Sequence, residues 1–166
     1  AGSVLHTRRR SPFASRSPIQ LGAELYGDAS AAADLEIISL MLETMRRLGV
    51  RDLTLDLGHV GIFRALMQDL ALDAPVQEAV FEALQHKSAP QIAAIVAEAG
   101  LDEARAGLLR RLAGLNGGRE VIGRAAQLFA AAAPSACAPL AALADVADKI
   151  AARMPEVQLQ FDLCEL

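Results

Sequence analysis

Three polar residues on one side of an alternating stretch are the main candidates for a binding site. Residues 17–27 read SPIQLGAELYG, and from residue 19 an apolar residue occupies every second position. Strand side chains alternate between two faces, so Gln20, Gly22 and Glu24 share the other face. Strand geometry predicts roughly 13 Å between the Cα atoms of Gln20 and Glu24. An amide and a carboxylate at that spacing, with room above the glycine, can bracket a small polar ligand. The pattern also fits an exposed hairpin face or an internally satisfied polar pair.

A basic segment lies just before this stretch. It contains Arg8, Arg9, Arg10 and Arg16. Guanidinium groups bind phosphate through paired hydrogen bonds, so Arg9 and Arg16 are candidates for contacts with phosphate or with a partner. The same run also fits a solvated hairpin tip. A tRNA-binding module built on it would lose affinity steeply with added salt.

The sequence predicts no metal site, cofactor or catalytic residue. His6, His59 and His86 are too far apart in the sequence to match metal-ligand spacing, and neither Cys137 nor Cys164 has a neighbouring ligand. Two distant cysteines in apolar contexts predict no disulfide and suit a reducing cytosol. The chain has no GxSxG, no HExxH and no glycine-rich phosphate loop before a helix.

Composition restricts the class of protein further. The 166 residues are 53% hydrophobic and carry a net charge of −4. This balance predicts a folded chain and argues mildly against a dedicated nucleic-acid binder. No apolar run reaches the length of about 18 residues that a membrane span needs. The chain starts and stops inside apparent strands, which predicts an internal piece of a longer protein.

The elements around the candidate site predict a hairpin, a helix and a strand. Residues 1–7 and 17–26 pair as strands across the basic loop 8–16. A helix over about 30–48 is expected to bury one apolar stripe. The stripe comprises Ile37, Ile38, Met41, Leu42, Met45 and Leu48. Gly49 ends this helix, and residues 52–58 alternate as a strand with one buried face.

From residue 60 to about 153 the pattern is helical. One helix starts at Val60 and a second is capped by Asp73, while Ser88 and Gln91 fit a capping box. Residues 116–118, Asn-Gly-Gly, predict a loop, and the last helix covers about 138–153 with an Asp145–Lys149 pair. A final strand, with residues 157, 159, 161 and 163 on its apolar face, closes the chain. Helices inserted between distant strands predict an α+β fold.

The hairpin resembles motif 2 of class II aminoacyl-tRNA synthetases, most closely the histidyl-tRNA synthetase branch. Its second strand matches Q-x-G-x-E-x-x-G at Gln20, Gly22, Glu24 and Gly27. In that branch the glutamine and glutamate hold the amino acid histidine. The resemblance therefore implies an antiparallel class II sheet flanked by helices, and a histidine site at Gln20, Gly22 and Glu24.

Two positions depart from the synthetase pattern. His6 stands where the family's ATP-binding arginine belongs, and Arg8 stands where the glutamate that reads adenine belongs. Histidine cannot supply a guanidinium's paired hydrogen bonds, and Arg8 reverses the charge of the adenine acceptor. An aminoacylating enzyme is not expected to tolerate both changes.

A non-catalytic paralogue fits better. Residues 1–66 are similar to the regulatory subunits of ATP phosphoribosyltransferase, which the resemblance implies pair with a short catalytic subunit at the first step of histidine biosynthesis. It further implies feedback by histidine, a self-dimer within a hetero-oligomer, a cytoplasmic location and no tRNA. The implied organisation is a synthetase-like core at 1–71, a helical insertion at 72–153 and a returning core strand at 154–166. The alternative is a divergent enzyme that still forms an aminoacyl-adenylate.

Overall fold

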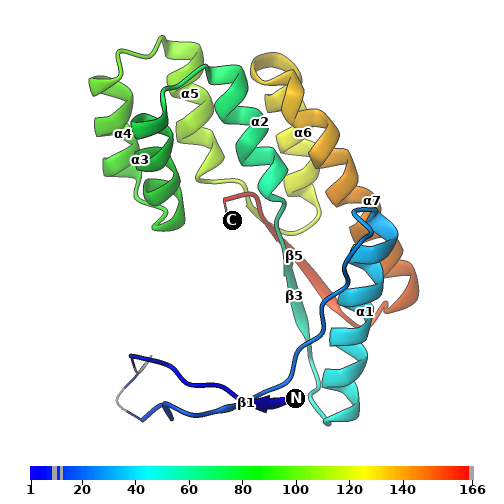
Figure 1. The fold of residues 1–166 in the computed structure, drawn as a ribbon. Coiled ribbons are helices and arrows are strands. Elements are labelled where there is room, and N and C mark those ends of the chain that lie inside the picture. The colour runs from blue at the N-terminus through cyan, green and yellow to red at the C-terminus, as the bar shows by residue number, and fades with distance from the viewer. Residues whose placement is uncertain (9–10, 12, 165–166) are drawn as a thin grey trace.

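The structure is a computed structural model that describes residues 1–8, 11 and 13–164. A curved array of helices lies at one end of the molecule and an N-terminal hairpin projects at the opposite end, with a small sheet between the helices (Figure 1). The elements in order are β1 (Gly2–Ser3), β2 (Ile19–Gln20), α1 (Ala31–Arg47), β3 (Thr54–Leu57), α2 (Val60–Leu70), α3 (Ala74–Gln85), α4 (Ala89–Glu98), α5 (Glu103–Leu112), β4 (Asn116–Gly117), α6 (Glu120–Ala132), the 3-10 turn η1 (Pro134–Ala136), α7 (Cys137–Arg153) and β5 (Gln158–Asp162).

The N-terminal hairpin is confirmed, but its strands are shorter than predicted. Gly2 lies opposite Gln20 and Ser3 opposite Ile19 in antiparallel register. Two further backbone hydrogen bonds continue the pairing toward the tip. The amide of residue 4 donates to the carbonyl of residue 18 (3.0 Å), and the amide of residue 6 donates to the carbonyl of residue 16 (2.8 Å). Residues 21–26 form no strand, because alternation alone does not create one without a partner for the backbone groups.

The main sheet has the order β3-β5-β4 and is mixed. β3 pairs with β5 in parallel and β4 pairs with β5 in antiparallel fashion, so the β3–β5 pair differs from the antiparallel sheet that the resemblance implies. The predicted loop at 116–118 is wrong for its first two residues, since Asn116 faces Asp162 and Gly117 faces Phe161. The long helical connection between β3 and β5 is what permits their parallel pairing.

Capping explains where several helices begin. The side chain of Ser30 accepts a hydrogen bond from the amide of Ala33 at the start of α1 (3.4 Å), and Asp73 accepts from the amide of Val76 at the start of α3 (3.1 Å). Ser88 stands at the N-cap of α4 but makes no side-chain cap bond, so the capping-box prediction is wrong. The Asp145–Lys149 pair on α7 is confirmed at 2.6 Å.

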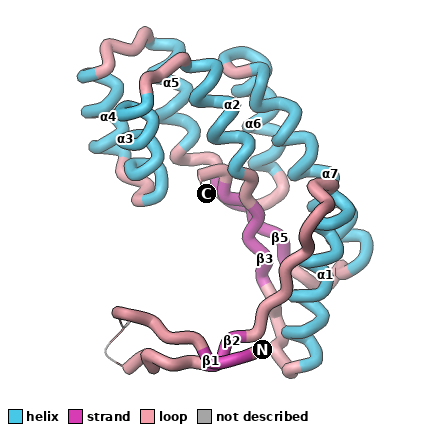
Figure 2. Tube along the Cα trace, viewed as in Figure 1, coloured by secondary structure: helices cyan, strands magenta, loops and turns pink. Residues whose placement is uncertain are grey.

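The predicted buried stripe of α1 is only partly correct. Leu42 is buried with Ala33 and Leu35, and Ile38 packs against the core. Met41, Met45 and Leu48 instead remain exposed. Among the described residues α1 packs on α7, as Figure 2 also shows, and these three side chains lie away from the core.

One hydrophobic core joins the sheet to the helices. It runs from Leu35 on α1 through Leu55 and Leu57 on β3 to Phe129 on α6 and Phe161 on β5. The helices follow one another in packed pairs, α3 on α4, α4 on α5, α5 on α6 and α6 on α7. This arrangement confirms the α+β class. Among the described residues no helix has the length and apolar character needed to cross a bilayer.

Candidate functional site

The predicted ligand residues lie on the projecting hairpin and are open to solvent. Gln20 closes β2 opposite Gly2, while Gly22 and Glu24 follow in extended chain outside any strand. All three are exposed, and a Cβ placed on Gly22 would meet no described atom within 4 Å. Of the readings that the sequence allows, the described residues therefore show the exposed hairpin face. The described residues place no side chains opposite these three that would enclose a ligand.

Glu24 already has a hydrogen-bond partner. The hydroxyl of Tyr26, two residues along, donates to Oε2 of Glu24. This bond is the main reason that the pKa of Tyr26 lies above its ordinary value of 10.0, and slight desolvation adds to the effect. The pair offers a ligand one carboxylate that is oriented by a phenol. Such a group can accept hydrogen bonds from an ammonium or imidazole N–H.

The residues at the degenerate ATP positions face different surroundings. His6 is half-buried in the hairpin, and its carbonyl accepts a 3.4 Å hydrogen bond from Nε of Arg16. Arg8 is exposed, and Arg9 lies outside the described residues. Within the described part of the chain, the Arg16 side chain thus links the two arms of the hairpin, a role that the sequence did not predict.

A second polar surface, which the sequence analysis missed, lies on the main sheet. Thr54 faces Gln158 and Asp56 faces Gln160 across the parallel pair, and all four are exposed. Their neighbours Leu55 and Leu57 point into the core on the other side. The alternation of 52–58 and 157–163 predicted each strand separately, but no sequence signal gave their register. These side chains can hydrogen-bond a ligand or another segment of chain.

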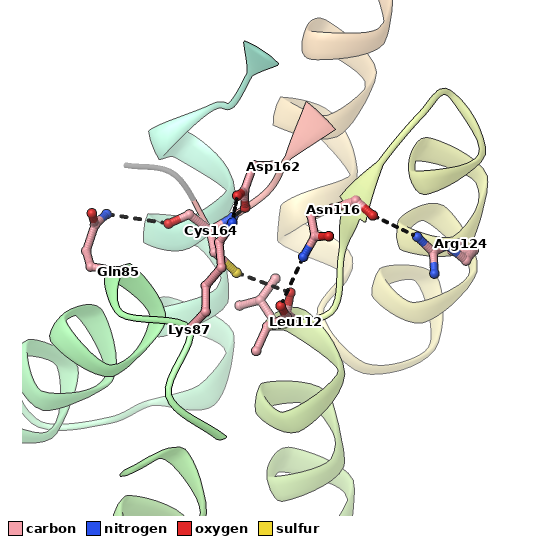
Figure 3. A network of polar contacts seen from close by, with 8 residues as sticks. Gln85, Lys87, Leu112, Asn116, Arg124, Asp162 and Cys164 are labelled. Atoms are coloured by element: carbon pink, nitrogen blue, oxygen red, sulfur yellow. Dashed lines mark hydrogen bonds and ion pairs between the residues drawn. The ribbon is translucent and has the colours of Figure 1, made fainter. Parts of the chain in front are cut away.

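A buried polar network secures the end of β5 to the helices (Figure 3). Asp162 is only 3% exposed and forms an ion pair with Lys87, which follows α3. Its Oδ1 also accepts a 3.0 Å hydrogen bond from the amide of Cys164. The carbonyl of Cys164 accepts in turn from Nε2 of Gln85 at 3.4 Å. Alternation along the strand places 162 and 164 on its polar side, and this prediction is wrong because residues of α3 and α5 and of the turn after α3 contact these two residues.

The Cys164 thiol is chemically quiet. It is buried and donates to the carbonyl of Leu112 at 3.1 Å. Burial, helped by the nearby charge of Asp162, raises the pKa of Cys164 to about 12. A thiol that stays protonated at neutral pH is a poor nucleophile and a poor metal ligand. Within the described residues, His, Cys, Asp and Glu form no cluster of three that could hold a metal ion.

Comparison with known proteins places this geometry in context. The family model for histidyl-tRNA synthetase matches residues 1–166. The chain is 48% identical over all 166 residues to the ATP phosphoribosyltransferase regulatory subunit of Azotobacter vinelandii and 47% identical to that of Pseudomonas fluorescens. In both cases the match covers 100% of this chain and 42% of the relative. The chain thus spans about two fifths of the length of the curated relatives it matches.

Two solved structures share the fold. One is an ATP phosphoribosyltransferase regulatory subunit/histidyl-tRNA synthetase from Bacillus halodurans, with a TM-score of 0.70, 26% identity, and coverage of 84% of this chain and 36% of that one. The other is the ATP phosphoribosyl transferase (HisG:HisZ) complex from Thermotoga maritima, with a TM-score of 0.60 over 82% of this chain and 46% of that one. At 15% identity the second comparison establishes the fold alone.

Proposed function

This chain belongs to the histidyl-tRNA synthetase family, and on that premise we propose that it is part of a non-catalytic regulatory subunit of ATP phosphoribosyltransferase. The observation that carries the proposal is identity of 46–48% to curated regulatory subunits over every residue of the chain. The enzyme joins ATP to phosphoribosyl pyrophosphate in the first step of histidine biosynthesis. The subunit's role is to activate the catalytic partner and to respond to histidine.

The hairpin chemistry supports a non-catalytic role. Adenylate formation needs a fixed cation beside the phosphates and an acceptor for the adenine amino group. The hairpin offers the imidazole of His6 and the exposed cation of Arg8 at those positions. Neither can do the work of the residue it replaces. A divergent synthetase-like enzyme remains the alternative, and robust pyrophosphate exchange with ATP, Mg²⁺ and histidine would favour it over our proposal.

Co-purification tests the proposed partner directly. The full-length protein is mixed with a short-form ATP phosphoribosyltransferase catalytic subunit from the same organism, and the complex is isolated by size exclusion. We expect one hetero-oligomeric species and a strong rise in transferase activity over the catalytic subunit alone. Failure to form a complex, or activity that does not depend on the added protein, would contradict the proposal.

Self-association is proposed for the exposed side of α1. Leu40, Met41, Met45 and Leu48 are 38–69% exposed there. Apolar side chains gathered on one helix face mark an interaction surface. We propose a self-dimer inside the hetero-oligomer, in the cytoplasm, without tRNA. Sedimentation of the full-length protein tests the dimer, and a gel shift at near-physiological salt tests the absence of tRNA binding.

The chain organisation is also part of the proposal. We assign 1–71 and 154–166 to the synthetase-like core and 72–153 to a helical insertion. The exposed row formed by Thr54, Asp56, Gln158 and Gln160 lies on the core side of this division. Limited proteolysis of the full-length protein tests it, since cleavage is expected near the two junctions before the interior of either part.

Histidine sensing is proposed for Gln20, Gly22 and Glu24. Their types and spacing match the histidine-binding strand of the family, and the phenol of Tyr26 orients the Glu24 carboxylate. In the full-length protein, we propose that other segments of chain cover these three residues and complete the site. An effector changes activity only when it binds one state of the complex better than the other. Loss of a charge that contacts histidine should therefore weaken inhibition.

A matched pair of variants tests the sensing site. Glu24→Ala in the full-length subunit should raise the histidine concentration for half-inhibition of the assembled enzyme about tenfold or more, since a charged hydrogen bond is worth about 1.5–3 kcal/mol. Glu78→Ala, at an exposed position on α3, serves as the control and should leave the inhibition curve unchanged. Identical curves for both variants would place the effector site elsewhere.

A further inference from the structure

A groove of about 340 Å³ lies between α5 and α6 and combines apolar and cationic residues. Leu115, Leu128 and Ala132 give it an apolar lining, and Arg111 and Arg124 add two guanidinium groups. The groove lies far from the hairpin, at the other end of the molecule, in the helical array of Figure 1. Nothing in the proposed histidine site or in the polar network at β5 accounts for this combination.

The two arginines of the groove differ from the others on the same helices. Three neighbouring arginines have carboxylate partners: Arg105 with Asp102, Arg110 with Glu103 and Arg119 with Asp148. Within the described part of the chain, Arg111 and Arg124 have none. They bond instead to carbonyl oxygens, Arg111 Nε to Gly107 at 3.0 Å and Arg124 Nη2 to Asn116 at 3.3 Å. The second of these bonds is drawn in Figure 3.

These carbonyl bonds prepare both side chains for an anion. Each bond uses part of the guanidinium fork and fixes the side chain, while the remaining N–H donors and the full charge stay available. Holding a long side chain in place beforehand lowers the entropy cost of binding. An arginine pair held beside an apolar surface is therefore suited to a carboxylate that lies next to an apolar side chain.

The surroundings favour a peptide over a free phosphate. Phosphate sites commonly use backbone N–H groups at the start of a helix. Arg111 instead lies in the last turn of α5, where the helix ends in carbonyl groups and offers an anion no free backbone N–H. The apolar residues Leu128 and Ala132 would gain nothing from phosphate, whereas they can cover a leucine or valine side chain of a partner.

We propose that this groove receives an acidic segment of the catalytic subunit, in which a carboxylate side chain sits beside an apolar one. The inference rests on the proposed function and adds to it a surface and the chemistry of its partner. α7 stands between α6 and α1, so the groove is separate from the exposed side of α1 that we assign to self-association. A subunit can thus use both surfaces at once.

Charge reversal in the groove provides the main test. The dissociation constant of the full-length protein for the catalytic subunit is measured by calorimetry at several salt concentrations. Arg111→Glu with Arg124→Glu should weaken binding about tenfold or more and flatten its salt dependence, because buried interfacial charge pairs carry several kcal/mol. Arg51→Glu with Arg64→Glu makes the same change in charge at two exposed positions outside the groove and should have little effect.

A second variant tests the groove without replacing either arginine. Ala131→Glu places a carboxylate at an exposed position lining the groove, where it can occupy the guanidinium groups from within the same chain. It should weaken the complex by a similar factor. Arg111→Gln with Arg124→Gln gives a neutral version, and unchanged circular dichroism and melting temperatures show that each variant is folded.

The possible outcomes separate the two proposals. If the wild-type proteins form no complex, the proposed function fails. If they bind and all groove variants bind equally well, this inference alone is wrong. If the groove variants instead change the oligomeric state of the regulatory subunit by itself, the groove belongs to self-association and the inference is likewise overturned.

Discussion

The hairpin segment, residues 1–28, and the packed region, residues 31–164, differ in how far their apolar side chains are buried. In the packed region Leu66, Phe129 and Ala147 are completely buried, and one core connects strands to helices. In the hairpin segment Phe13 is 99% and Ile19 83% exposed. Yet the residues whose chemistry first draws attention, Gln20, Gly22 and Glu24, all lie in the hairpin segment.

The contrast shows that an apolar pattern in the sequence does not by itself mean that the side chains are buried. In residues 31–164 one common core buries most of the large apolar side chains, although Met41, Met45 and Leu48 on α1 remain exposed. Among the described residues the hairpin segment pairs with itself through a few backbone bonds, and none of its apolar residues belongs to the common core. A binding site built on it needs contacts from beyond the hairpin.

Two phenylalanines give the largest contrast. Phe129→Ala leaves a cavity in the common core and should lower the free energy of unfolding by about 3–5 kcal/mol. Phe13→Ala, at the exposed tip, should change it by less than about 0.5 kcal/mol. Urea denaturation of both variants measures the difference. Comparable losses would show that the hairpin tip is packed in the folded protein and would break the comparison.

The buried ion pair gives the next effect. Lys87→Met removes the partner of Asp162, which is 3% exposed, and should cost about 1–3 kcal/mol because a buried carboxylate loses its counter-charge. The Lys87 side chain is 51% exposed, which limits the cost. Lys149→Met breaks the exposed pair with Asp145 and serves as the control, with an expected change below about 0.5 kcal/mol. Equal costs would mean that burial of Asp162 does not matter.

Alkaline pH probes the same end of the packed region. Cys164 has an ordinary pKa of 9.0 and a folded-state pKa of about 12. Above pH 9 the unfolded chain loses this proton while the folded chain keeps it, so stability is full below pH 9 and falls between 9 and 12. The loss should be about 1.4 kcal/mol between pH 8 and pH 10. Denaturation curves measure it.

A pair of cysteine variants assigns this pH dependence. Cys164→Ala should remove the alkaline loss that the Cys164 thiol causes, while Cys137→Ala should retain it. If the slope between pH 8 and pH 10 stays the same in Cys164→Ala, then the Cys164 thiol is not the responsible group. The result would also show that the end of β5 is less enclosed than its contacts with Leu112 and Gln85 indicate.

The sequence predicted the packed region best where a local signal sets the structure. The side chain of Asp73 caps α3, and the alternation of 52–58 correctly predicted β3. Both signals are local, because capping and period-two burial act within a few residues. The loop prediction at Asn116 and Gly117 was wrong, since a turn-forming pair can also form a two-residue strand when β5 lies beside it. Burial of Asp162 and Cys164 depends on helices that are distant in sequence, and no local pattern contains that information.

The sequence nominated residues for the candidate site, and their role stays a prediction, but it did not give their arrangement. Alternation and family resemblance both pointed to Gln20, Gly22 and Glu24, but pattern alone predicted a strand through residue 26 where the structure ends it at Gln20. The row formed by Thr54, Asp56, Gln158 and Gln160 required the register of a parallel pair. The Arg111–Arg124 groove required helix packing that brings residues from two helices together.

The smallest effect concerns Tyr26 and Glu24 on the hairpin. Tyr26 is 85% exposed, so Tyr26→Phe should leave the unfolding transition unchanged. The pKa of Tyr26 is nevertheless raised above 10.0, chiefly because ionisation would break its hydrogen bond to Glu24 and set two anions side by side. Ultraviolet absorbance of phenolate, taken as the difference between wild type and Tyr26→Phe, reports this titration. Residues 1–166 contain one tyrosine, which keeps the signal simple for this chain.

Glu24→Gln shows whether the carboxylate is engaged. It removes the anion and should lower the pKa of Tyr26 toward 10.0, while Glu36→Gln, an exposed position on α1, should leave that pKa raised. A Tyr26 that titrates at its ordinary value in the wild type would mean that Glu24 points freely into solvent. If the expected shift is found, histidine added to the full-length protein should change it, because a ligand ammonium competes with the phenol for the same carboxylate. The exposed hairpin would then be recognised as a binding surface by a change in the proton equilibrium of one side chain.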